Sequence, residues 1–110
     1  LVRVLLADRE PVVKLEALEG LARIGLDPEG EVARAIAFSM DRPDGERLHL
    51  ASTDTLYRII IASGGAAHPD TYRVLAQAAR GSYPRRVREY AARLLGELAR
   101  SSGSERGEGP

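Results

Sequence analysis

Side chains that could carry out chemistry are sparse in this chain. Its two histidines, His49 and His68, have no second His or carboxylate three or four residues later in a clear metal-binding pattern. Asp70 follows His68, but the intervening Pro69 is typical of a helix start. No stretch resembles a nucleophile elbow, and the glycines lack the spacing and the Lys of a phosphate-binding loop. The sequence therefore predicts a non-catalytic chain with no cofactor or metal site.

Arginine is concentrated in the last third of the chain. Residues 71–100 contain seven arginines against two glutamates, whereas residues 1–70 contain eight basic against twelve acidic residues. Arg85, Arg86 and Arg88 open a predicted helix, where cations oppose the helix dipole. This asymmetry indicates a partner surface, with an acidic protein segment as the first choice and a phosphate backbone as the second, against the plainer alternative of solvated helix faces. The formal net charge of zero argues against a uniformly basic nucleic-acid binder.

Length and composition fit one small helical domain. The 110 residues are 44% apolar but only 5% aromatic, which suits close contact between helices. The chain has no Cys, no signal-peptide pattern and no run of about 18 apolar residues that could span a bilayer. Because it begins with Leu1 inside a helical pattern, we expect a piece of a longer protein. The compartment stays open, with the cytoplasm favoured.

Prolines, glycines and apolar stripes divide the chain into helices. Gly25 is the expected C-cap of a helix that has Pro11 in its first turn, and Asp27-Pro28 predicts the next start, with Asp as N-cap and Pro as first helical residue. Apolar stripes at helical spacing follow, formed by Val32, Ile36 and Met40, by Leu48, Ser52, Leu56, Ile59 and Ile60, by Tyr72, Leu75, Ala76 and Ala79, and by Val87, Ala91, Leu95 and Leu98. Residues 101–110 have no apolar side chain to bury, which predicts a disordered tail or linker.

The helical pattern is repeated along the chain. A shift of 74 positions places Val13 on Val87, Ala17 on Ala91 and Leu21 on Leu95. A shift of about 39 places Ser52, Leu56 and Ile60 at the same three positions of the middle helix. Units near 37 residues, each a pair of helices, are typical of an α-solenoid.

The repeated segments resemble the HEAT-repeat family, especially the short HEAT-like repeats of bacteria. The second helix of that family commonly carries Val-Arg, then Ala, then Leu-Gly, and VREYAARLLGELA (Val87 to Ala99) matches it closely. VKLEALEGLARIG (Val13 to Gly25) matches with Lys for Arg. The resemblance implies an all-α, right-handed α-solenoid of stacked helix hairpins, with about 2.5 repeats and five helices. Its expected domain is 1–100, made of units 1–25, 27–64 and 68–100, followed by the tail 101–110.

The middle unit departs from this pattern. Ser52 and Thr53 replace the Val-Arg pair, and Leu56 replaces the small Ala, which should widen or re-angle the stack there. In the family the basic residue after Val often pairs with an acidic group of a neighbouring loop. The resemblance therefore implies such a role for Lys14 and Arg88, which Thr53 cannot take.

We expect a scaffold that binds a protein partner through the exposed side of the second helices, which line the concave face of HEAT-like stacks. Residues off the apolar stripes there include Lys14, Arg23, Asp54, Tyr57, Arg58, Arg88 and Arg93. The predicted partner-binding residues are Lys14, Arg23, Tyr57, Arg85, Arg88 and Arg93. The alternatives are a nucleic-acid-associated domain that uses the arginine-rich last third, a non-catalytic part of a HEAT-like lyase or glycosylase, and self-association through open repeat ends.

Overall fold

The chain folds into helices that alternate between two layers. The computed structural model describes residues 2–7, 10–42, 45–64 and 66–107, with side chains as far as residue 100. These residues form six helices and no strand: α1 (Val2–Ala7), α2 (Pro11–Ile24), α3 (Glu31–Met40), α4 (Glu46–Ala62), α5 (Pro69–Arg80) and α6 (Arg85–Gly107). The predicted all-α class is confirmed.

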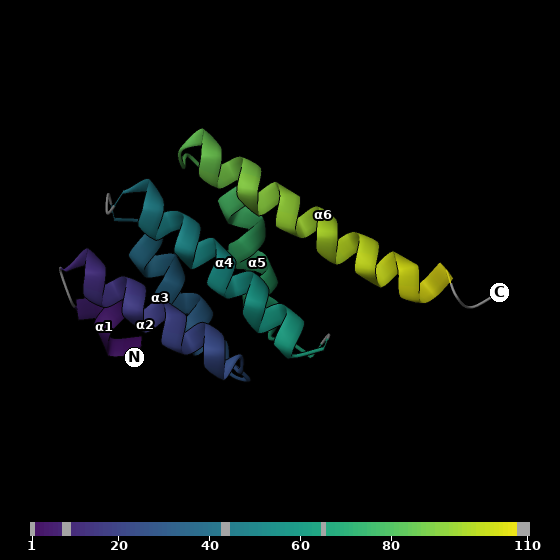
Figure 1. Ribbon diagram of the computed structural model, residues 1–110, viewed down its shortest axis with the longest axis horizontal. Helices are drawn as coiled ribbons and strands as arrows, with labels where there is room; N and C mark the ends of the chain where they lie inside the picture. Colours follow the sequence, from purple (N-terminus) through teal and green to yellow (C-terminus); the bar gives the residue numbers. More distant parts are fainter. Residues whose placement is uncertain (1, 8–9, 43–44, 65, 108–110) are drawn as a thin grey trace.

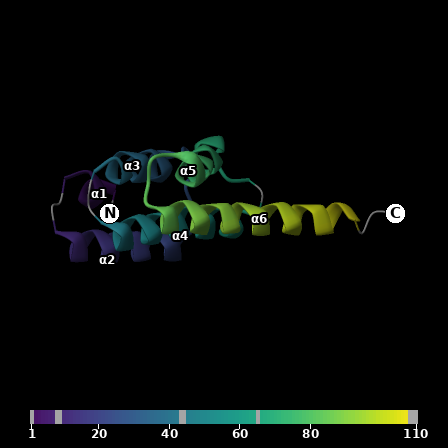
Figure 2. The ribbon, with the colours of Figure 1, turned by 90° about the horizontal axis from the view of Figure 1, so that it is seen from above.

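One layer contains α1, α3 and α5, and the other contains α2, α4 and α6 side by side (Figure 1, Figure 2). Within the layers α1 contacts α3, α3 contacts α5, α2 contacts α4 and α4 contacts α6. Consecutive helices in the pairs α1–α2, α3–α4 and α5–α6 also contact each other across the layers. The shortest extent of the molecule is 18 Å, which fits two layers because packed helix axes lie about 8–10 Å apart.

The helix count and the end of the last helix differ from the prediction. Five helices were expected, but the described residues contain six because Val2–Ala7 forms a helix of its own and buries Leu5 completely. α6 continues to Gly107 instead of giving way to a tail at residue 101. Each added residue gains a backbone hydrogen bond, and no proline follows Pro84 within this helix to stop it. The last turns of α6 project past the other helices in Figure 1.

The central helix α4 holds much of the core. Its predicted stripe of Leu48, Ser52, Leu56, Ile59 and Ile60 is buried, and so is the stripe of Val32, Ile36 and Met40 on α3. Ala17 and Ala91, the small residues at the repeated position, are 2% and 0% exposed. The prediction that Tyr72 lies on the packing side of α5 is wrong, since Tyr72 is 37% exposed. The buried residues of α5 are Thr71, Val74, Leu75 and Ala78, so its inner face is rotated from the predicted one.

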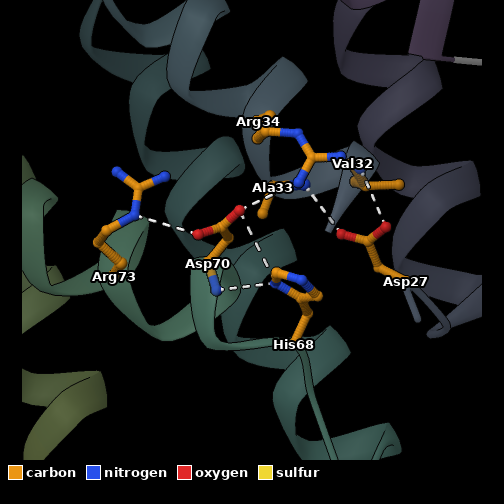
Figure 3. A network of polar contacts seen from close by, with 7 residues as sticks. All are labelled: Asp27, Val32, Ala33, Arg34, His68, Asp70 and Arg73. Atoms are coloured by element: carbon orange, nitrogen blue, oxygen red, sulfur yellow. Dashed lines mark hydrogen bonds and ion pairs between the residues drawn. The ribbon is translucent and has the colours of Figure 1, made fainter. Parts of the chain in front are cut away.

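The start of α3 also differs from the prediction, although Asp27 still caps the helix. Residues 27–30 form a turn closed by the Gly30 N–H on the Asp27 carbonyl, and the helix begins only at Glu31. The Asp27 carboxylate reaches over this turn and accepts hydrogen bonds from the N–H groups of Val32 and Ala33, both at 3.0 Å (Figure 3). It thereby satisfies two backbone donors that have no partner inside the helix.

Gly25 ends α2 as predicted. Its φ of +66° is left-handed, and its N–H donates to the Leu21 carbonyl at 3.0 Å. A Cβ placed at this position would lie 2.7 Å from the Cβ of Ala62. Glycine is therefore needed both for its backbone conformation and for the close approach of the C-terminal ends of α2 and α4.

Candidate interaction surface

The structure places the predicted partner-binding residues in three different settings. Arg23 on α2 and Arg85, Arg88 and Arg93 on α6 are exposed, and Tyr57 on α4 is half-buried. Lys14 was predicted on the exposed side, and this is wrong because it is only 1% exposed. Lys14 has an interaction partner in the protein, because a buried charged group is stable only when it is paired or hydrogen-bonded. The layer of α2, α4 and α6 nevertheless presents a polar face beside a groove.

Tyr57 and Arg93 meet on this face through Glu97. The Tyr57 hydroxyl donates to Glu97 Oε2 at 3.2 Å, and Arg93 Nε lies 3.9 Å from Glu97 Oε1. Burial and the Glu97 carboxylate raise the pKa of Tyr57 above its ordinary value. The Tyr57 hydroxyl thereby ties α4 to α6.

A second link between the same two helices involves Tyr90, Asp54 and Arg58. The Tyr90 hydroxyl donates to Asp54 Oδ1 at 2.8 Å, and Arg58 Nε donates to Asp54 Oδ2 at 2.8 Å. Burial, followed by the hydrogen bond to Asp54, raises the pKa of Tyr90 to about 12. Each carboxylate oxygen of Asp54 thus has its own donor. The hydrogen bond to Asp54 restrains the Arg58 guanidinium.

A groove of about 350 Å³ runs between α2 and α4 next to this link. Its apolar side chains are Leu15, Leu18, Ala22 and Ala51, with Thr55 among them. Its charged side chains are Glu19 and Arg23 on α2 and Asp54 and Arg58 on α4. The small side chains of Ala22 and Ala51 leave this space open between two helices that otherwise pack together.

The arginines that open α6 are only partly engaged. Arg85 Nε lies 2.7 Å from Glu89, and Arg86 Nε lies 3.7 Å from Glu46 on α4. Arg88 makes no ion pair with the described residues. Because successive helical residues lie about 100° apart, Arg88 is on a different side of α6 from Arg86 and Tyr90. The structure therefore does not gather Arg85 and Arg88 with Tyr57.

The two histidines make contacts within the fold. His49 is 6% exposed, its Nε2 lies 3.1 Å from the Arg42 carbonyl oxygen, and its ring meets Tyr83 edge-on at 5.7 Å. Burial, followed by the Asp41 carboxylate, raises the pKa of Tyr83. His68 caps α5, where its Nδ1 accepts the Asp70 N–H at 3.0 Å. The predicted helix start at His68-Pro69-Asp70 is confirmed.

Asp70 connects α5 to α3 in the layer opposite the groove (Figure 3). Its carboxylate lies 3.0 Å from an Arg34 terminal nitrogen and 3.2 Å from Arg73 Nε. The hydrogen bond from Arg34, with a further one from Arg73, holds the pKa of Asp70 below its ordinary value of 3.8. A carboxyl group whose pKa is lower in the folded than in the unfolded chain stabilises the fold above its unfolded pKa.

Acidification should therefore cost stability through Asp70. The contribution is complete at neutral pH, above the unfolded pKa, and is lost as the pH falls through the lower folded pKa. We expect Asp70→Asn to be less stable than the unmodified chain at neutral pH and to lose less stability on acidification. Urea denaturation followed by circular dichroism at a series of pH values measures both effects. Asp41→Asn, an exposed position without an ion pair among the described residues, is the control; an identical acid response in both variants would contradict the assignment.

Three further findings concern membranes, metal ions and known proteins. None of the described helices is both long enough and apolar enough to cross a lipid bilayer. Among the described side chains, no three of His, Asp and Glu gather where they could hold a metal ion. Comparisons with protein-family models, with curated proteins and with solved structures gave no match.

Proposed function

We propose that this chain is a non-catalytic HEAT-like repeat module that binds a protein partner through the layer of α2, α4 and α6. One observation carries the proposal: a single helix layer presents tyrosines fixed by hydrogen bonds between helices, and an arginine held by a carboxylate of its own helix, beside a groove with apolar and charged side chains. Tyr and Arg are the side chains that most often dominate binding energy at protein interfaces.

The arrangement of the helices supports the solenoid part of this proposal. Each described helix contacts its partner in a pair and the corresponding helix of the next pair. In α-solenoids each repeat likewise contacts only its neighbours, and the stacked second helices form one extended surface. Three such pairs, the first of which begins with the short helix α1, would account for the six described helices if they stack with a right-handed turn. The surface of α2, α4 and α6 would then be the concave face.

Prior ordering of the side chains supports the binding part. Tyr57 and Tyr90 each donate to a carboxylate on the neighbouring helix, at 3.2 Å and 2.8 Å. Side chains that are already held lose less conformational entropy when a partner binds. A binding surface of this kind does not require a change in the fold.

The arginine-rich last third gives less support to nucleic-acid binding. Arg85, Arg86 and Arg93 each lie within 4 Å of a carboxylate, which reduces the positive field available to a phosphate backbone. A protein partner is therefore the function that the surface supports best.

Capture of a partner with matched variants tests the proposal. Partners cross-linked to the purified chain are identified by mass spectrometry, and their dissociation constants are then measured with the recombinant proteins. We expect Tyr57→Ala and Arg23→Glu each to weaken binding about tenfold, the loss of about 1.4 kcal/mol that is typical of an interface anchor. The matched controls Tyr72→Ala and Arg80→Glu alter exposed residues of α5 in the opposite layer.

The proposal assigns binding to the layer of α2, α4 and α6 and not to the opposite layer, and the experiment can overturn this assignment. Binding should persist in both α5 variants and all variants should retain the helical circular dichroism spectrum. Equal losses in the two layers, or losses only in the α5 variants, would show that the partner does not bind to α2, α4 and α6.

A further inference from the structure

The layer of α2, α4 and α6 has two edges, and the described residues leave a helix face uncovered at each of them. α4 lies in the middle and contacts both of its neighbours, whereas α2 and α6 form the edges (Figure 1). The three helices share one sequence pattern, so the shifts of 74 and about 39 positions identify equivalent residues on them. The same helix face can therefore be compared where a neighbour covers it and where none does.

On α2 and α4 one face is covered by the following helix of the layer. On α2 this face contains Leu18 and Leu21, both buried, and the Thr55 hydroxyl of α4 lies 3.4 Å from the Leu18 carbonyl oxygen. On α4 the equivalent residues are Tyr57 and Ile60. Ile60 is buried, and the Tyr57 hydroxyl donates a hydrogen bond to α6. The two junctions in the layer thus use the same repeated positions.

On α6 the equivalent face is open. It contains Arg88, Ala92 and Leu95, of which the first two are exposed and the third is half-buried. Tyr90 and Glu97 face α4, and successive helical residues lie about 100° apart, so the three lie on the opposite side of α6. α4 and α5 pack on α6 from other sides and leave Arg88 and Ala92 exposed. The face that forms both junctions of the layer therefore remains available at this edge.

The outer side of α2 provides the opposite half of such a junction. The side of α4 that meets α2 contains Ala51 and Thr55, and the equivalent residues of α2 are Val12 and Glu16. Val12 is 63% exposed, and Glu16 is exposed as well. Both lie on the side of α2 that points away from Leu21 and hence from α4. Each edge of the layer therefore has the half of the junction that the other edge lacks.

The two edges also have complementary charges. Arg88 is the charged residue of the open face of α6, and Glu16 is the charged residue of the outer side of α2. Neither has an ion pair with another described residue. Transferred by the repeat, the contact between Thr55 and Leu18 places Glu16 of a second copy beside Ala92, one helical turn from Arg88. A carboxylate and a guanidinium so placed favour a second copy of this chain in one register.

The charges next to these two faces come in pairs of opposite sign. Glu89 on α6 lies 2.7 Å from Arg85. Glu19 and Arg23 on α2 both line the groove that faces α4. Because these pairs add no net charge to either edge, Glu16 and Arg88 determine the attraction between the edges.

We propose that copies of this chain associate head to tail, with the outer side of α2 in one copy packed against the open face of α6 in the next. The α2 helix of the second copy would occupy the place beside α6 that α4 occupies beside α2. A contact between two different faces leaves one of each free, so it can be repeated from copy to copy. The inference concerns the edges of the layer and goes beyond the partner proposed for its polar face.

Sedimentation velocity of the unmodified chain, from about 10 µM to about 1 mM, tests this. Because each contact is one helix face wide, we expect weak association, with a dissociation constant on the order of 0.1 mM. The weight-average mass should rise with concentration and should exceed the mass of two chains at the upper end. Added salt should lower it, because salt screens an exposed ion pair.

Exchange of the two charges identifies the faces that meet. Glu16→Arg and Arg88→Glu should each weaken association at least about fivefold, because like charges then face each other. The chain with both changes should associate within about twofold of the unmodified chain, since the pair is restored in the reverse order. Glu29→Arg in the α2–α3 loop and Arg47→Glu on α4 make the same charge changes at other exposed positions and should have no effect. All variants should keep the helical circular dichroism spectrum.

Three results would overturn the inference. A mass that is independent of concentration would show that the edges do not associate, and a mass that stops at two chains would show that like faces meet. Equal effects of the control variants, or a double variant as weak as the single ones, would show that Glu16 and Arg88 do not meet. Capture of a partner through Tyr57 and Arg23 requires neither edge, so the proposed function can fail or stand separately.

Discussion

Replacing Leu56 by Ala should lower the free energy of unfolding by about 2–5 kcal/mol, the range found when a buried Leu leaves a cavity. Leu56 is 0% exposed and lies in α4, which contacts α2, α3, α5 and α6. Few neighbours can move into the space, because α4 is enclosed on several sides. Chemical denaturation followed by far-ultraviolet circular dichroism measures the loss.

An exposed apolar residue on the same helix is the control for Leu56. Ile61 is 52% exposed, so Ile61→Ala removes less buried area and should cost about 1 kcal/mol or less. Similar losses at the two positions would mean that α4 is not the enclosed centre of the fold.

Burial along α4 was predictable because it depends on a pattern within one helix. The stripe of Ser52, Leu56 and Ile60 was placed by its register with Ala17 and Ala91, and all of these positions are buried. The end of α2 at Gly25 and the start of α5 at His68-Pro69 were likewise predictable, since a left-handed glycine and a proline in the first turn act locally. Local rules failed at Asp27, whose side chain caps α3 from beyond an intervening turn.

The contacts that build the candidate surface could not be read from the sequence. Asp54 and Arg58 are four residues apart, a spacing typical of a helical ion pair. Tyr90, however, comes from a helix 36 residues further along, and nothing in the sequence pairs it with Asp54. The groove depends on Ala22 and Ala51, which look like ordinary helix residues until α2 and α4 are placed side by side.

Lys14 and Arg88 show the same limit for burial. They occupy equivalent positions in the repeated pattern, yet Lys14 is 1% exposed and Arg88 lies on the surface. A sequence repeat identifies equivalent positions on the helices, whereas the burial of a side chain depends on which segments pack next to its helix. The family resemblance therefore indicates which positions carry a basic residue, but not whether that residue is exposed to a binding partner.

Replacing Ala91 by Leu should destabilise the fold by about 1–3 kcal/mol through overpacking. Ala91 is 0% exposed on α6, which packs against both α4 and α5. A leucine does occupy the equivalent position of α4, where Leu56 is completely buried. That position is surrounded by side chains that fit a leucine, whereas the neighbours of Ala91 are packed around a methyl group and would have to move.

Thermal unfolding of Ala91→Leu beside Ala92→Leu measures this difference. Ala92 is the next residue of α6 and is exposed, so its replacement should change stability by no more than about 0.5 kcal/mol. The two variants have the same composition and the same intrinsic helix propensity, and differ only in the side of α6 that carries the larger side chain. An unchanged midpoint in Ala91→Leu would mean that α6 does not approach its neighbours closely at this position. The equivalence of Ala17, Leu56 and Ala91 as sites of close helix contact would then be wrong.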